Sequence, residues 1–239
     1  LNEKCIVNHS CYFGATNNNY TEFDKLDKHR VCGIKLFMGS STGNMLVDKM
    51  NSLLNIFNGT DMLIAAHCED QETIKNNIEK YKQKYKGADD IPVSAHPSIR
   101  SVPACYASSE LAVRLAKIAG ARLHILHVST AKELQLFSDE PLASKNITAE
   151  ACVAHLLFTL THYNSLGTRI KCNPAVKRKT DREALRAAVN SGLIDVIATD
   201  HAPHLLNEKE GGALKAMSGM PMIPVSYTHL RAHETPEHL

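Results

Sequence analysis

The sequence lacks the features that mark membrane-spanning, secreted or nucleic-acid-binding chains. No run of about 18 apolar residues occurs, which disfavours a transmembrane helix. No charged-then-apolar leader opens the chain, which disfavours an intact secretion signal. The net charge of +2 is near balance, so a phosphate backbone is not an expected partner. These absences predict a cytoplasmic protein that binds neither membrane nor nucleic acid.

Paired cysteines and phosphate loops are also absent. The seven cysteines are scattered, with no Cys-x-x-Cys pair, so reduced and buried thiols are expected in place of a disulfide framework or a structural zinc knot. The glycine-rich loop at 39–43 does not have the Gly-x-Gly-x-x-Gly spacing, and no Walker-type Gly-Lys-Ser/Thr follows. A nucleotide-binding Rossmann sheet is therefore disfavoured.

Four apolar, strand-like runs carry polar side chains inside them or at their ends: Lys35 in 31–39, His67 in 62–70, His127 in 123–130 and Asp200 in 194–204. Each of these residues alone is more often an ordinary core or turn residue. Because the arrangement recurs on separate strands, it indicates a shared site at the carboxyl ends of parallel strands.

Helical patterns alternate with these strands. Helices are predicted over 45–57, 71–85 and 104–119, and Thr-x-x-Glu capping boxes at 130–133 and 180–183 predict two further helix starts. Residues 170–172 predict a short strand, whereas 148–160 mixes helix and strand signals. The alternation predicts parallel βαβ units, either a TIM-like barrel or an open doubly wound sheet. Functional residues on several strand ends favour the barrel.

The polar side chains suit metal chemistry. Imidazole and carboxylate are good ligands for zinc, so His67, His127 and Asp200 predict a metal site. Lys35 is unusual, because an unpaired ammonium in an apolar run is costly. It either reaches the rim of the barrel, or pairs with an acid at 69–70, or captures carbon dioxide as a carbamate that bridges two metal ions.

Five motifs in this order resemble dihydroorotase of the amidohydrolase superfamily: Gly33-Ile34-Lys35-Leu36-Phe37, Ala66-His67-Cys68-Glu69-Asp70, Leu126-His127-Val128-Ser129-Thr130, Lys171-Cys172-Asn173-Pro174 and Ala198-Thr199-Asp200-His201-Ala202-Pro203-His204. Residues 38–46 resemble the Bacteroidetes-type class I branch. The resemblance covers residues 1–224. It implies an α/β fold, a partial TIM-like (β/α)8 barrel, and a zinc enzyme of pyrimidine biosynthesis that interconverts N-carbamoyl-L-aspartate and dihydroorotate.

The resemblance also implies roles for the metal-site residues. Lys35 would be the bridging carbamate, His67 and His127 would bind the second metal, and Asp200 would bind the first. One or two Zn²⁺ ions per chain are expected, two if Lys35 is carbamylated. Asp200 would also act as general base and acid, passing a proton to the leaving nitrogen.

Other residues would contact the substrate or support the ligands. By the same resemblance, Asn173 and His204 would bind the substrate, with His204 suited to a carboxylate. His155 and Glu150 are expected at most to orient ligands from behind. The expected partners are a small-molecule substrate, a second copy in a homodimer, or aspartate transcarbamoylase.

The sequence departs from this family at its start. Members carry a His-x-His motif on the first barrel strand, followed by a substrate-binding Arg and Asn, and no His-x-His occurs here. The expectation is a fragment that lacks the first strands and the C-terminal return of the chain, inactive and poorly soluble by itself. Residues 225–239 are interpreted as a non-native tail, because they look like a translated sequencing adapter.

Two kinds of alternative remain. A dihydropyrimidinase, hydantoinase or allantoinase would share the metal site and differ in its substrate contacts, although Asn173-Pro174 and the Asp200-to-His204 spacing favour dihydroorotase. A non-catalytic dihydroorotase-like subunit that scaffolds a transcarbamoylase would typically have lost ligands. Because Lys35, His67, His127 and Asp200 are all present, an enzyme is favoured.

Overall fold

A computed structural model describes residues 8–39 and 45–224 of the chain. Six parallel strands form one sheet in which each strand pairs with the next in sequence. The strands are β1 Cys11–Gly14, β2 Val31–Phe37, β3 Ile64–His67, β4 Leu123–Ile125, β5 Ile147–Cys152 and β6 Val196–Ala198. The helices are α1 Met50–Asn58, α2 Gln71–Lys84, α3 His96–Ile99, α4 Val102–Ala119, α5 Val153–Leu157, α6 Tyr163–Leu166 and α7 Lys179–Asn190.

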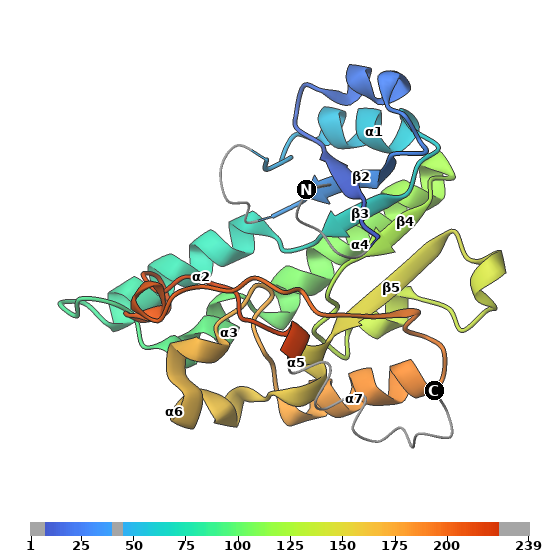
Figure 1. Cartoon of the computed structure of the whole chain (residues 1–239). Coiled ribbons are helices and arrows are strands. Elements are labelled where there is room, and N and C mark those ends of the chain that lie inside the picture. Colours follow the sequence, from blue (N-terminus) through green and yellow to red (C-terminus); the bar gives the residue numbers. More distant parts are fainter. Residues whose placement is uncertain (1–7, 40–44, 225–239) are drawn as a thin grey trace.

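The strands and helices are arranged as in an incomplete barrel. Strand order follows chain order, which is the arrangement of a (β/α)8 barrel. Figure 1 shows the strands from β2 to β5 side by side, and the view from behind shows α1, α4 and α7 in front of them on one side of the sheet. Among the described residues β1 and β6 each pair on one side alone. The predicted partial TIM-like barrel is confirmed.

Side chains that alternate along the strands separate the hydrophobic core from the face that carries the polar residues. Ile34, Ile64 and Leu123 are register partners on β2, β3 and β4 and are fully buried in the main hydrophobic core. Successive side chains of a strand point to opposite faces. The next row, with Lys35 opposite Ala65 and then His124, therefore faces the other side of the sheet. This register puts the polar strand residues on the concave side of the barrel.

Three sequence predictions need correction. The helix expected over 45–57 begins only at Met50, because residues 45–47 run beside β2, where Val47 N–H donates to the Phe37 carbonyl. The capping box at 130–133 opens a short 3₁₀ helix, Glu133–Leu136, and no α-helix. The strand expected at 170–172 does not form, because its carbonyls accept from Gly219 N–H and the His96 ring and not from a neighbouring strand.

The other helix predictions differ only at their ends. The mixed segment 148–160 is the end of β5 followed directly by α5. Helix α7 begins one residue before the expected box, because Asp181 and not Glu183 accepts the N–H of the N-cap residue Arg178. The helix ends before Gly192, which adopts the left-handed conformation at a φ of 76°.

Cysteine burial follows the prediction in part. Six free cysteines lie in the described part of the chain: Cys68, Cys105, Cys152 and Cys172 are buried, and Cys11 and Cys32 are exposed. Over residues 8–39 and 45–224, no helix is long and apolar enough to span a membrane. The tail at 225–239 lies outside the described residues.

A buried ion pair holds the start of β6 against β5. Lys145 Nζ lies 2.7 Å from Asp195 Oδ1, the two side chains are 1% and 4% exposed, and Asp195 also accepts the Ala149 N–H at 2.9 Å. Removing one partner of such a pair leaves a buried charge without compensation. We expect Asp195→Ala to lower the free energy of unfolding by about 3–5 kcal/mol in urea denaturation.

The exposed pair between Lys25 and Glu22 provides the matched control. Its side chains are 70% and 48% exposed, so Glu22→Ala should change the free energy of unfolding by less than about 1 kcal/mol. If the two substitutions changed the free energy of unfolding equally, the Lys145–Asp195 pair would not be stabilising the contact between β6 and β5.

Candidate functional site

Two histidines from neighbouring strands meet at the carboxyl end of the sheet. His67 is the last residue of β3, and His127 follows β4 by two residues. His67 Nδ1 and His127 Nε2 lie 2.9 Å apart, and the rings are nearly perpendicular at 78°. Both side chains are buried. The structure therefore brings together two of the predicted metal ligands, with one nitrogen of each ring facing the other.

Backbone strain marks two of the predicted ligands. His127 and Asp200 have φ angles of 39° and 45°, and they are the two non-glycine residues with positive φ in the described part of the chain. Such conformations cost about 1–3 kcal/mol each and concentrate at functional sites. The strain turns each side chain away from the course its strand would otherwise give it.

Lys35 is a half-buried residue of β2. Its Nζ is 4.7 Å from the centroid of the Phe37 ring. Burial lowers the pKa of this amine, and the nearby carboxylates of Asp200 and Glu150 oppose that shift. The alternative pairing with an acid at 69–70 is wrong, because Glu69 contacts His67 and Arg100 while Asp70 caps α2 through the Thr73 N–H.

Asp200 belongs to the same electrostatic neighbourhood. As a whole residue it is exposed, but desolvation of its carboxyl raises its pKa, and the His67 ring and the Lys35 ammonium act against that shift. A carboxyl group with a raised pKa exchanges protons more readily near neutral pH than an ordinary aspartate.

The two predicted substrate residues, Asn173 and His204, differ in their present hydrogen bonding. The buried Oδ1 atom of Asn173 has no hydrogen-bond partner within the described ranges. The His204 ring donates from Nε2 to the Ser218 carbonyl at 3.1 Å, and its Nδ1 lies 3.6 Å from Glu208. Asn173 thus offers a free acceptor, whereas the contacts of His204 are to its own loop.

Glu150 and His155 lie behind the pair. Glu150 Oε1 accepts the backbone N–H of His127 at 3.2 Å, and Oε2 lies 3.1 Å from His124 Nε2. His155 Nε2 donates to the Pro174 carbonyl at 2.9 Å, and burial lowers the pKa of this ring to about 4. Glu150 supports the strained backbone of His127, and His155 supports the turn that carries Asn173.

The two imidazoles fit a metal ion between them. Two nitrogens bound to one tetrahedral zinc at 2.0–2.1 Å would be about 3.3 Å apart, so the observed 2.9 Å needs a small opening. The buried Nδ1 of His127 has no partner in residues 8–39 and 45–224. In the same ranges no group of three or more His, Cys, Asp or Glu side chains could hold a metal ion. The histidine pair could therefore supply two nitrogen ligands to a metal ion, and such an ion would need further donors.

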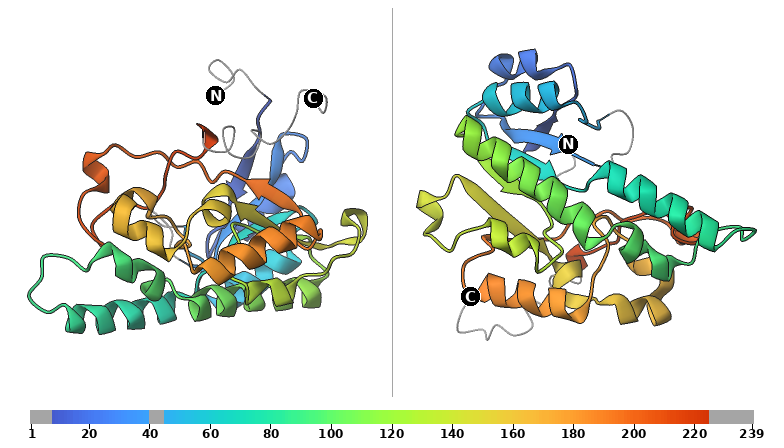
Figure 2. Two further views of the ribbon diagram at one scale, coloured as in Figure 1. Left: turned by 90° about the horizontal axis from the view of Figure 1, so that it is seen from below. Right: turned by 180° about the vertical axis from the view of Figure 1, so that it is seen from behind.

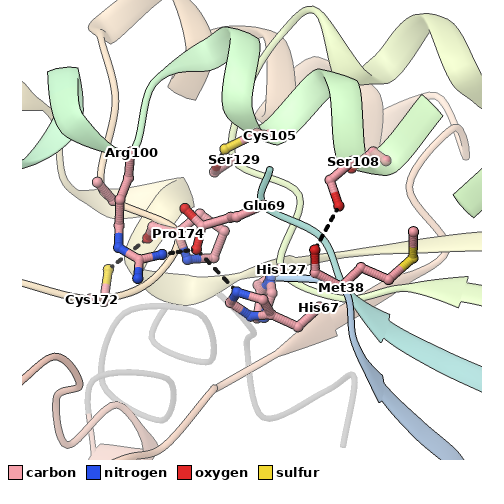
Figure 3. A network of polar contacts seen from close by, with 12 residues as sticks. Met38, His67, Glu69, Arg100, Cys105, Ser108, His127, Ser129, Cys172 and Pro174 are labelled. Carbon is pink, nitrogen blue, oxygen red and sulfur yellow. Dashed lines mark hydrogen bonds and ion pairs between the residues drawn. The ribbon is translucent and has the colours of Figure 1, made fainter. Parts of the chain in front are cut away.

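Sequence reasoning missed the support of His67. Figure 3 shows Glu69 between His67 and Arg100, and His67 Nε2 lies 3.0 Å from Glu69 Oε2 while Arg100 Nη1 contacts the same oxygen. The His-x-Glu spacing was a usable signal for Glu69. Arg100 lies 31 residues further on, and only the fold brings it to Glu69.

Comparison with known proteins finds curated relatives named dihydroorotase. The chain is 32% identical over 198 residues to the dihydroorotase of Halalkalibacterium halodurans, covering 80% of this chain and 43% of the relative. It is 30% identical over 226 residues to the dihydroorotase of Geobacillus thermodenitrificans, covering 92% and 50%. The chain spans about half the length of the curated relatives it matches. No family model matches the sequence.

Solved structures agree in fold. L-hydantoinase (dihydropyrimidinase) from Arthrobacter aurescens superposes with a TM-score of 0.83 at 24% identity, covering 96% of this chain and 53% of that one. Dihydroorotase from Saccharomyces cerevisiae, solved with 5-fluoroorotic acid, gives a TM-score of 0.64 at 17% identity, covering 94% and 62%. At these identities the likeness supports the barrel fold alone.

Proposed function

We propose that this chain carries part of the active site of a cyclic-amide hydrolase. Most of the chain aligns with proteins named dihydroorotase, and the aligned part covers about half the length of each of them. The reaction is the interconversion of N-carbamoyl-L-aspartate and (S)-dihydroorotate in pyrimidine biosynthesis. The observation that carries the proposal is the buried contact between His67 and His127 at adjoining strand ends, in a chain with dihydroorotase homologues.

The proposed metal is zinc, held by His67, His127, Asp200 and a carbamylated Lys35. When bound, zinc supplies Lewis acidity toward the ring amide and a nucleophile at neutral pH. The fit rests on donor chemistry, because imidazole, carboxylate and carbamate oxygens all suit this ion. A lowered pKa favours the neutral amine of Lys35, the form that reacts with carbon dioxide.

The chain's own residues would move the proton and bind the substrate. Asp200 would accept a proton from the water that attacks the ring amide and would return it to the amide nitrogen as that nitrogen leaves. The buried Oδ1 of Asn173, which lacks a partner among the described residues, would accept a hydrogen bond from a ring N–H. His204 would bind the substrate carboxylate once its ring turns from its present partners.

We expect the complete product of the gene that encodes these residues to interconvert carbamoyl-aspartate and dihydroorotate. Activity should disappear with a chelator and return with Zn²⁺, because the facing imidazoles of His67 and His127 would supply two of the proposed zinc ligands. The measurement is the absorbance of dihydroorotate, with metal content by mass spectrometry. The 239-residue chain alone is expected to be inactive, because its sequence contains no His-x-His motif.

The same assay tests the alternatives. Turnover of hydantoin, dihydrouracil or allantoin in place of dihydroorotate would assign the protein to another cyclic-amide hydrolase, whose fold is equally compatible. A folded, metal-free and inactive gene product would instead indicate a scaffolding subunit, and co-purification with aspartate transcarbamoylase would identify its partner. A homodimer is the expected state of an active enzyme.

A further inference from the structure

The carboxylate of Glu69 is shared by a histidine and an arginine. Glu69 is fully buried, and its Oε2 atom lies 3.0 Å from His67 Nε2 and in contact with Arg100 Nη1. His67 and Arg100 are buried as well, 4% and 7% exposed. Figure 3 shows the carboxylate between the guanidinium of Arg100 and the His67 ring. The other nitrogen of that ring, Nδ1, lies 2.9 Å from His127 Nε2.

Arg100 makes the shared oxygen of Glu69 a hydrogen-bond acceptor. A guanidinium has N–H donors and no acceptor, and Arg100 Nη1 contacts Glu69 Oε2, the same oxygen that lies 3.0 Å from His67 Nε2. The nitrogen that faces it must therefore carry the proton, so the lone pair of the His67 ring lies on Nδ1.

We propose that Glu69, held by Arg100, is a positioning residue that fixes His67 in the Nε2–H tautomer and so directs the Nδ1 lone pair toward His127. This inference rests on the proposed function in one respect, because the ligand for that lone pair is the proposed metal ion. Carboxylate–histidine–metal arrangements of this kind set both the tautomer and the orientation of the ring.

The inference predicts what happens when the acceptor is removed. Without Glu69 the Nε2–H group would be buried with no acceptor. The ring would then shift its proton to Nδ1 or turn, and either change blocks the nitrogen that faces His127. Loss of such an outer partner typically weakens metal binding by about 10–100-fold.

The test compares two double variants of the complete gene product that differ only at position 69. Both carry Arg100→Met, so that no buried guanidinium is left without the Glu69 carboxylate. Replacing a buried ion pair by apolar groups of similar volume is often neutral for stability. Glu69→Gln then keeps an acceptor oxygen, whereas Glu69→Met removes it. The probe is Co²⁺ alone, titrated by its visible absorption against a competing chelator.

We expect the Gln variant to bind Co²⁺ within a few-fold of the wild type and the Met variant to bind about 10–100-fold more weakly. Equal affinities in the two variants would overturn the inference. Glu133→Gln is the matched control, since Glu133 is another buried carboxylate, and its contacts are to Ser109 and Thr130. This control should bind Co²⁺ as the wild type does.

A second measurement separates this inference from the proposed function. Two-bond ¹H–¹⁵N spectra of metal-free protein report directly which nitrogen of His67 carries the proton. We expect Nε2–H in the wild type and loss of that preference in the Met variant, whereas a proton on Nδ1 in the wild type would overturn the inference. Wild-type protein with the expected tautomer and no affinity for Co²⁺ would contradict the proposed function alone.

Discussion

Lys35→Ala in the complete gene product should reduce dihydroorotate turnover by about 10³-fold, the equivalent of several kcal/mol of transition-state stabilisation. The physical reason is that the Lys35 amine, which lies over the Phe37 ring, would be the source of the proposed carbamate. Metal content should fall together with activity. The measurements are initial rates and metal-to-protein ratios on the same preparations.

A matched pair of variants separates carbamate chemistry from packing. Lys35→Ala leaves a cavity that a small carboxylate such as propionate can enter, and its two oxygens would stand in for those of the carbamate. Lys35→Met fills the same space with apolar atoms and should not respond to propionate. Activity of Lys35→Met close to that of the wild type would show that the amine has no part in the reaction.

Asp200→Asn should reduce kcat by about 10²–10⁴-fold, the range typical for loss of a general acid–base residue. The amide has the shape of the carboxyl group but cannot accept the proton. Desolvation raises the pKa of this carboxyl, which suits it to the proposed proton transfer. The amide of Asn cannot perform that transfer. The measurement is kcat and KM for both directions of the reaction, with metal content as a second readout.

Two control variants are compared with Asp200→Asn. Asp61→Asn removes an exposed carboxylate that pairs with Lys28 and should leave kcat unchanged. His204→Gln should raise KM more than it lowers kcat, because His204 is proposed to bind the substrate and not to transfer the proton. Unchanged kcat in Asp200→Asn with metal retained would remove Asp200 from the proposed mechanism.

Local sequence patterns predicted the strands and helix ends that are determined by neighbouring residues. The apolar runs around Lys35, His67 and His127 are strands because buried parallel strands need continuous apolar sequence. The left-handed Gly120 after α4 ends that helix as its position predicts. The alternation of strands and helices predicted parallel βαβ units, and the polar residues at several strand ends favoured the barrel over an open sheet.

The sequence predictions of secondary structure were wrong where hydrogen bonds to segments distant in sequence determine the local structure. Residues 170–172 have the composition of a strand, but their carbonyls bond to His96 and Gly219, which lie far away in sequence. The helix at 45–57 is shortened for a similar reason, since Val47 is drawn to the edge of β2. Propensity gives way to tertiary hydrogen bonding in both cases.

The contact between His67 and His127 could be anticipated from the sequence, but the residues that support it could not. His67 and His127 were identified by their positions at strand ends, and the fold brings them into contact. The partner of Glu69 could not be found, because Arg100 enters from a loop between α3 and α4. Charge pairs across the fold carry no local periodicity, so sequence patterns do not reveal them.

The positive φ angles of His127 and Asp200 have an evolutionary consequence. Glycine adopts this backbone conformation without steric penalty, so replacement by glycine would relieve strain at both positions while deleting a proposed ligand. A laboratory selection for thermal stability alone would be drawn toward glycine there, and selection for turnover would restore the original residues. These two positions are where stability and activity should trade against each other most directly.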